Sequence, residues 1–398
     1  MTIWGLALTA ACLPLYVVRW RIGPLPTTLL ETIILFTALA YLLTLWTERR
    51  RPAARTFLDL PIALLLIAGV IGIIVSPDLT RAAGIYRAYF LEAVAVFYIA
   101  VDMIRTREDL RRVLLVAGLG ISLFAIGQLA VFGIAFNEHT LRLGKAPSFL
   151  NTSPNSVALF LEPPLAFALG FLLFPSKPRE RWIALVFLAI ILAATITTLS
   201  RASYVAMAAL AVLVVLTIPS RRWRFIAIGV MATIALVILE VPFVSQRLNN
   251  LAKSVVNRES LYGQALHMLS QRPVFGAGIS GFPVRVAPFR PPNQVVQLYP
   301  HDLWLTTWSE LGLLGVLAFA FIFFSLLWRG LRRLGSAGGI AHPVLWGAVG
   351  ALLLYLVHGF FDSPYWKNDL SVEFWLIAAL EVIAIRGLAG MLGARSGS

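Results

Sequence analysis

The chain has 398 residues, of which 59% are hydrophobic and only 13% are charged, and its formal net charge is +14. Soluble domains are about 45–50% apolar and about 25% charged, so this composition excludes an ordinary soluble domain and favours a membrane protein. The single cysteine, Cys12, excludes an internal disulfide and a thiolate metal cluster.

Apolar stretches close to the ~20 residues that cross a bilayer recur from one end of the chain to the other. They predict an all-α polytopic membrane protein with about twelve transmembrane helices. The first segment lacks a basic leading region, so we expect no cleavable signal sequence. In chain order the predicted spans cover residues 3–18, 27–46, 58–76, 83–103, 113–135, 155–174, 182–199, 202–219, 225–242, 303–327, 343–361 and 371–388.

Basic clusters occupy every second connection between these spans. Positively charged loops stay in the cytoplasm, which predicts that both termini are cytoplasmic. Most of the net charge is then explained by topology, and a nucleic-acid partner is not needed. The clusters lie at residues 48–55, 105–112, 175–181, 221–224 and 328–333.

The opposite side carries one long connection, residues 243–302, and a shorter one, residues 136–154. The long connection begins with apolar residues at helical spacing and ends in glycine- and proline-rich sequence that cannot continue a helix. We therefore predict a helical cap on the outer face. This divides the chain into residues 1–242 with nine spans, the loop domain 243–302, and residues 303–398 with three spans and a cytoplasmic tail.

Several cations lie on this outer side, where the topology does not require them. Arg201 is the sharpest case, because the predicted hairpin between spans seven and eight leaves almost no loop to hold it in water. An ionisable group at such depth is usually paired or functional, although snorkelling to the headgroups is the simpler alternative. The others are Arg81, Arg87, Arg142, Lys145, Arg247, Lys253, Arg258, Arg272, Arg285 and Arg290.

Arg258 stands near the start of the outer helix, behind Asn257, a plausible N-cap. Arginine together with helix N-terminal amides suits a phosphate, and a solvated surface arginine is the alternative. Arg142 and Lys145 are either part of this anion-binding set or ordinary loop charges. Tyr86 and Arg87 are either part of it or interfacial anchors. The cluster as a whole predicts an acidic ligand at the outer leaflet, such as a phosphate-bearing lipid.

His301 lies outside, where span ten begins, and its near-neutral titration suits a general acid or base. A capping or hydrogen-bonded structural role is the alternative. Glu310 is nine residues later, about 180° away on a continuous helix. His358 and Asp362 lie one turn apart and could be structural packing.

Other motifs give no support to a cofactor. The string "GISG" at residues 278–281 matches that of rhomboid proteases, but Ser280 lies in a glycine- and proline-rich loop, so we interpret it as chance. No zinc-binding spacing and no phosphate-binding P-loop occurs. We therefore expect no metal and no nucleotide cofactor.

Four stretches in order resemble the bacterial O-antigen ligase and polymerase superfamily. They are "LRLGKAPSFLNTSPNSVALFL" (141–161), "TLSRASYVA" (198–206), "NRESLYGQALHMLSQRPVFGAGISGF" (257–282) and "PHDLWLTTWSELGLLG" (300–315). They cover roughly a quarter of the chain. Asp302 stands where the family usually has Asn, and Tyr262 replaces the usual Trp.

The resemblance implies an inverting, metal-independent glycosyltransferase of the bacterial inner membrane, with a GT-C-like architecture and a periplasmic active site. Its donor would be a glycan on undecaprenyl diphosphate. Arg201 and Arg258 would grip the diphosphate, and Arg142, Lys145, Tyr86 and Arg87 would assist by position. His301 would activate the acceptor hydroxyl, with Asp302, Glu310 and Tyr262 in supporting roles.

Two reactions and one other class stay open at this stage. An O-antigen ligase, which transfers to lipid A–core during lipopolysaccharide biosynthesis, is favoured because the chain is compact with one sizeable outer loop. An O-antigen or exopolysaccharide polymerase differs only in its acceptor. A lipid or polysaccharide transporter is less favoured, because it would predict two similar halves and polar residues at mid-membrane.

Overall fold

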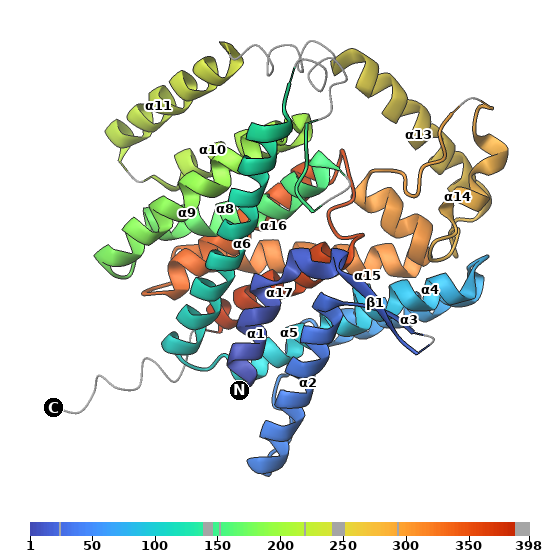
Figure 1. Ribbon diagram of the computed structural model, residues 1–398, viewed down its shortest axis with the longest axis horizontal. Coiled ribbons are helices and arrows are strands. Elements are labelled where there is room, and N and C mark those ends of the chain that lie inside the picture. Colours follow the sequence, from blue (N-terminus) through green and yellow to red (C-terminus); the bar gives the residue numbers. More distant parts are fainter. Residues whose placement is uncertain are drawn as a thin grey trace.

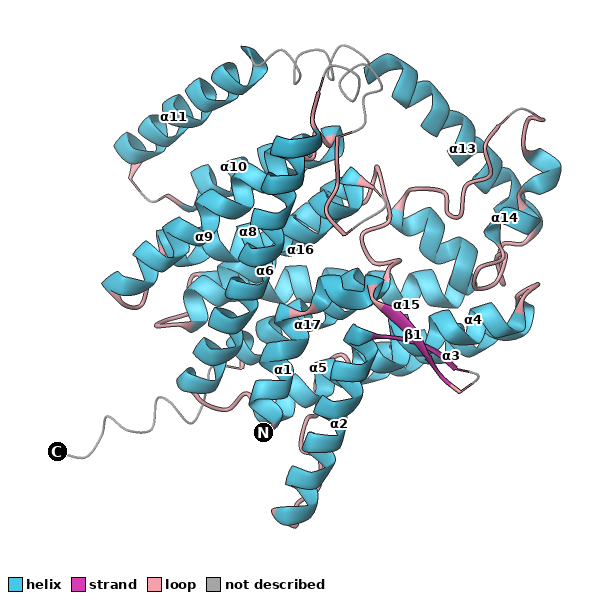
Figure 2. Ribbon diagram, viewed as in Figure 1, coloured by secondary structure: helices cyan, strands magenta, loops and turns pink. Residues whose placement is uncertain are grey.

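The computed structural model describes residues 1–23, 25–137, 146–150, 153–218, 220–240, 251–292 and 294–386. This part of the chain is almost entirely helical, and one short hairpin supplies its strands (Figure 2). In the hairpin, β1 (Arg19–Ile22) pairs antiparallel with β2 (Leu25–Thr28). The protein is therefore an all-α membrane protein at the level of its class.

Most of the helices follow one another with short connections, whereas the connection from α13 to α15, residues 272–302, is long (Figure 1). Consecutive helices joined by turns of a few residues run antiparallel, as crossing a bilayer back and forth requires. They are α1 (Thr2–Ala11), α2 (Leu29–Thr47), α3 (Asp59–Val75), α4 (Leu79–Tyr86), α5 (Glu92–Met103), α6 (Arg107–Ala135), α8 (Pro154–Leu173), α9 (Pro178–Thr197), α10 (Arg201–Thr217), α11 (Arg221–Glu240), α13 (Leu251–Gln271), α14 (Phe282–Arg285), α15 (Leu303–Leu334), α16 (Ala341–His358) and α17 (Asn368–Ile385).

Each of the twelve predicted spans overlaps one of these helices. Within the described residues, seven helical segments are long and apolar enough to cross a membrane, namely α2, the continuous stretch Leu79–Met103, α6, α8, α9, α15 and α16. Three shorter apolar helices, α1, α3 and α10, accompany them. The count of twelve and the GT-C-like architecture stay predictions.

The first predicted span, residues 3–18, is the one that departs most from a continuous α-helix in the structure. The α-helix ends at Ala11, and a 3-10 helix covers Leu13–Val17 before the hairpin begins. Pro14 lacks a backbone N–H, so it cannot extend the α-helical hydrogen-bond ladder. Residues 19–28, which carry no clear strand signal because each strand is only four residues long, then form the hairpin.

The centre of the bundle is formed by α8 and α16, which pack antiparallel through small residues. The α-carbon of Gly170 faces the carbonyl oxygen of Pro343, and Gly347 faces Phe167. A side chain at either glycine would collide with its neighbour, so these glycines set the closeness of the two helices. Small residues serve this purpose between membrane helices, where lipid offers no hydrophobic driving force for association.

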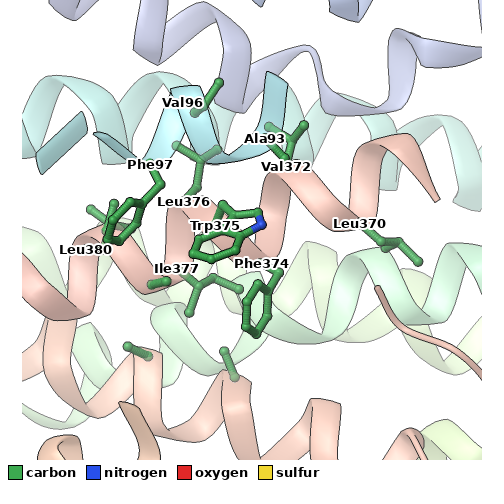
Figure 3. Close-up of a cluster of buried hydrophobic side chains, with 14 of the residues drawn as sticks. Ala93, Val96, Phe97, Leu370, Val372, Phe374, Trp375, Leu376, Ile377 and Leu380 are labelled. Atoms are coloured by element: carbon green, nitrogen blue, oxygen red, sulfur yellow. The ribbon is translucent and has the colours of Figure 1, made fainter. Parts of the chain in front are cut away.

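A second packed region joins α17 to α5. Figure 3 shows Trp375 and Leu376 of α17 directed toward Phe97 and Val96 of α5. The rings of Phe97 and Trp375 meet edge to face, with centroids 5.3 Å apart. These contacts lie in the middle of α17 and attach this helix to α5.

The helix α15 contains a break that matters for the site. Gly312 has φ 68° and ψ −171°, which separates a short outer segment from the long inner segment of α15. The loop 273–281 fits against this break. The N–H of Leu313 donates to Val274 O at 2.8 Å, and the N–H of Ala277 donates to Ser309 O at 2.7 Å.

The outer cap, as far as it is described, is α13, α14 and the loops that follow them, and Figure 1 shows it over the outer segment of α15. Its own small core contains Leu261, Met268 and Leu269 of α13 together with Phe282 and Val286. Leu305 and Trp308 of α15 pack against that core and attach the cap to the bundle. The helix α13 already begins at Leu251, so the prediction that Asn257 caps it and that Arg258 stands at its start is wrong.

Candidate functional site

His301 occupies a constrained position just before α15. Its backbone is left-handed, with φ 58°, a conformation that costs a non-glycine residue about 1–3 kcal/mol. The next residue, Asp302, caps the helix, because its Oδ1 accepts from the N–H groups of Trp304 (2.9 Å) and Leu305 (2.8 Å). The cap and the N–H of Leu303, which donates to Gly359 O at 2.7 Å, hold the strained turn in place.

Asp302 is largely buried, and burial raises the pKa of its carboxyl despite the two backbone donors that lower it. An asparagine at this position would accept the same two hydrogen bonds without a charge. The departure at position 302 therefore leaves the cap intact.

The imidazole of His301 lies between two side chains. Its Nδ1 is 3.0 Å from Oδ1 of Asp362, and its Nε2 is 3.1 Å from Oε1 of Gln297. Asp362 comes from the loop between α16 and α17, 61 residues further along the chain. Since a carboxylate on Nδ1 fixes the tautomer of a histidine, Nε2 is the nitrogen left for chemistry.

Asp362 is itself held by neighbours. The N–H of Ser363 donates to its Oδ1 at 2.9 Å, and Nδ2 of Asn155, in the first turn of α8, lies 3.4 Å from its Oδ2. Burial raises the pKa of Asp362, but the hydrogen bond and charge of His301, with the charge of His358, outweigh burial and lower it. The carboxylate is therefore the stable form beside His301.

His358 makes a different pair from the one that its spacing suggests. Its Nδ1 is 2.8 Å from Oε1 of Glu162 on α8, and both side chains are buried. The hydrogen bond of Asp362 goes to His301 instead. One-turn spacing fails here because α16 ends at His358, so Asp362 belongs to the loop that turns back over His301.

Tyr262 and Arg258 of α13 lie over the same loop. The Tyr262 hydroxyl is 2.7 Å from Phe360 O and 3.2 Å from His301 O, and burial raises its pKa. The Arg258 guanidinium stands 5.5 Å over the ring of Phe361. Its Nη1 is buried and has no hydrogen-bond partner among the described residues. A buried guanidinium nitrogen in this condition fits an anionic ligand.

Arg201 begins α10, after a turn in which Leu199 is left-handed, with φ 53°. Because α8, α9 and α10 are joined by short turns, the first turn of α10 lies at the same end of the bundle as the first turn of α8. Asn155, which contacts Asp362, is in that turn of α8. The fold thus places Arg201 at the end of the bundle that carries His301.

Tyr86 and Arg87 are engaged elsewhere. Arg87 contacts Glu31 at 2.7 Å and Glu92 at 3.2 Å, and the Tyr86 hydroxyl donates to Leu66 O at 3.1 Å. Their contacts connect α2, α3 and α5, and none of them reaches His301. A diphosphate would have to compete with two carboxylates for Arg87, so the role predicted for these two residues has no added support.

Glu310 is fully buried, and its Oε2 accepts the N–H of Ser280. It therefore anchors the loop 273–281 to α15, two residues before the break at Gly312. Ser280 has φ 62° and turns this loop through its backbone. The remaining predicted residues, Arg142 and Lys145, lie outside the described residues.

The sequence singled out His301, Arg258 and Tyr262, which the structure brings together. It did not assign a role to Asp362, Asn155 or Gln297. The signal for Gln297 was its position four residues before His301, and Asn155 lies inside a motif that was identified only as a resemblance. In the described part of the chain, no group of three or more His, Cys, Asp and Glu side chains could hold a metal ion.

Residues 183–320 match the family model described as O-antigen ligase. The matched segment includes Arg201, Arg258 and His301 but not Asn155 or Asp362. A search of curated proteins finds no match to the chain.

Proposed function

We propose, from the match of residues 183–320 to the O-antigen ligase family model, that the protein is an O-antigen ligase of the bacterial inner membrane. It transfers a glycan from undecaprenyl diphosphate to a sugar hydroxyl of lipid A–core at the periplasmic face. The reaction inverts the anomeric carbon and needs neither a metal nor a nucleotide. A polymerase of the same superfamily would use the same donor with a second lipid-linked glycan as acceptor.

His301 is the general base in this proposal. The acceptor hydroxyl oxygen attacks the anomeric carbon while Nε2 of His301 takes the hydroxyl proton. The bond from the anomeric carbon to the diphosphate oxygen breaks in the same displacement, so the configuration inverts. Asp362 on Nδ1 stabilises the imidazolium as it forms, which is why the ionised state of Asp362 matters.

Gln297 can form a hydrogen bond with Nε2 of His301 in both protonation states of the imidazole. Its amide oxygen suits the protonated imidazole, and its NH2 group suits the neutral one after a half-turn of the amide. The acceptor hydroxyl would displace Gln297 from Nε2, because one nitrogen lone pair cannot accept from both. Gln297 thereby occupies the position that an acceptor oxygen would take.

Arg258 and Arg201 would bind the diphosphate. Bidentate contacts from guanidinium groups to phosphate oxygens are among the strongest hydrogen bonds and compensate the charge of the leaving group. The unpartnered Nη1 of Arg258 supports this role, because its donor capacity is unused in the described structure.

The observation that carries the proposal is the pair of His301 and Asp362 beneath Arg258. It is tested in proteoliposomes with a lipid-linked glycan donor and lipid A–core. We expect His301→Ala to lower the transfer rate by about 10²–10⁴-fold, the usual contribution of a general base. His267→Ala is the matched control, because His267 is exposed on α13 and stacks on Phe289. Equal rates for the two variants would remove His301 from the mechanism.

A further inference from the structure

A cavity of about 510 Å³ lies between helices on the side of the bundle away from His301. Its walls come from α1, α6, α8, α9 and α17, of which α6, α8 and α9 lie side by side in Figure 1. None of His301, Asp362 and Arg258 lines it. The size falls within the range of about 300–1,000 Å³ that is usual for small-molecule sites.

The position of the cavity along the membrane follows from its lining residues. On α6 they run from Glu108 to Ile121, and on α9 from Arg179 to Ile191. On α6 this is the first half of the helix, and on α9 it continues past the midpoint; both stretches begin next to basic clusters that predict the cytoplasmic side. The cavity therefore begins at the end of the bundle opposite to the proposed active site and extends to about the middle of the helices.

Its wall is mostly apolar, contains small side chains, and has one buried carboxyl, that of Glu373. Ala168 and Ala184 are small residues of this wall, and Phe167 and Phe187 close the sides, with the ring of Phe187 packed against Gly118. An apolar void of this size in contact with lipid-facing helices suits a hydrocarbon chain. On the lipid side of α9, Trp182 and Val186 are exposed, which places the helix at the boundary with the bilayer.

At the rim of the cavity, the charged side chains that have no ion-pair partner are basic. Arg111 is 2.8 Å from Glu180 and 3.7 Å from Glu108, so its charge is compensated. Lys177 and Arg179 also line the cavity, and among the described residues no carboxylate lies within 4.0 Å of the charged nitrogens of either side chain, although Oε2 of Glu180 accepts from the backbone N–H of Lys177 at 3.1 Å. The rim thus offers two uncompensated cations at the mouth of an apolar void.

We propose that this cavity binds an anionic phospholipid of the leaflet next to the basic helix ends. One acyl chain fills the void between α6, α8 and α9, and the headgroup phosphate contacts Lys177 and Arg179. Apolar depth and a cationic rim together select a lipid that has both a hydrocarbon chain and a net negative charge. A neutral lipid would match only the first of these.

The proposal is tested by native mass spectrometry of the full-length protein after exchange into phosphatidylglycerol, phosphatidylcholine of equal chain length, or undecaprenyl phosphate. We expect one tightly held phosphatidylglycerol. The double variant Lys177→Gln/Arg179→Gln should weaken its retention about 25-fold, since each basic residue near an anionic lipid contributes roughly five-fold. The control pair Arg49→Gln/Arg51→Gln, on another basic loop, should leave retention unchanged. Equal retention of phosphatidylcholine, preference for undecaprenyl phosphate, or no retained lipid would each overturn the proposal.

A second variant tests the void itself. Ala184→Phe places a ring inside the cavity, whereas Ala189→Phe places the same ring on the exposed face of α9. We expect the first variant to abolish lipid retention and the lipid-dependent rise in melting temperature, and the second to keep both. If Ala184→Phe fails to fold, the rim variant still decides. Retention of phosphatidylglycerol by folded Ala184→Phe would contradict the proposed acyl site.

Discussion

At the scale of single residues, the site depends on where the backbone is forced to place His301. A left-handed residue between Pro300 and the capping Asp302 directs the imidazole toward Asp362 and away from α15. The sequence revealed the residue type and its neighbours. The partner, 61 residues later in a loop, could not be found by helical spacing because no single helix contains both.

The role of Asp362 can be measured directly. Asp362→Asn keeps an acceptor for Nδ1 of His301 but removes the charge that stabilises the imidazolium. We expect the transfer rate to fall by about 10²-fold or more while the donor concentration for half-maximal rate stays nearly constant. Initial rates over a donor titration in proteoliposomes provide the test. A rate within a factor of two of the unaltered protein would contradict the proposed role.

The pH dependence of stability should have opposite signs at Asp362 and Asp302. The pKa of Asp362 is lowered in the folded state, so its stabilisation is present above about pH 4 and is lost as pH falls below that value. The pKa of Asp302 is raised, so its favourable contribution is present below about pH 4 and is lost as pH rises. The melting temperature of Asp362→Asn should therefore lie below that of the unaltered protein by less at pH 3.5 than at pH 7.

Asp302→Asn should show the reverse trend and melt relatively higher at pH 7, because asparagine keeps the cap without a buried charge. Melting temperatures of the three proteins in detergent, measured at pH 3.5 and pH 7, give the comparison. A common direction for both variants would show that the two carboxyl groups do not differ in this way.

At the scale of elements, the sequence predicted the helices well because long apolar runs bounded by charges and prolines leave few alternatives in a bilayer. The predicted span 303–327 lies within α15, but the break at Gly312 was not predicted. Its cause is non-local, since the loop 273–281 bonds to the backbone at the break. Glu310, predicted as a supporting residue, contributes to the same attachment.

The break at Gly312 should be essential to this attachment. A side chain there would meet Val274 O at 2.2 Å, and the positive φ adds strain. We expect Gly312→Ala to destabilise the protein by more than about 1 kcal/mol and to lower transfer, because the cap would shift relative to His301. Gly335→Ala at the end of the same helix is the control, since nothing lies within 4 Å of that site. Equal melting temperatures of Gly312→Ala and Gly335→Ala would show that the backbone break at Gly312 does not contribute to stability.

At the scale of the whole molecule, an apolar helical bundle brings together residues from the cap, from α8 and from the loop before α17 at one end. The basic clusters mark the other end, where the further cavity lies. The composition and the distribution of charge predicted that the basic clusters and the candidate site lie at opposite ends of the bundle. They could not distinguish a ligase from a polymerase, because the two reactions differ in the acceptor and share the donor.

The most direct test is transfer by the purified, reconstituted protein in the presence of EDTA and without nucleotide. An undecaprenyl-diphosphate-linked glycan is supplied with lipid A–core or without it, and the products are separated by mass. We predict glycan on lipid A–core, formed with inverted anomeric configuration and only when lipid A–core is present. Elongation of the lipid-linked glycan in the absence of lipid A–core, with none transferred when it is present, would contradict the account.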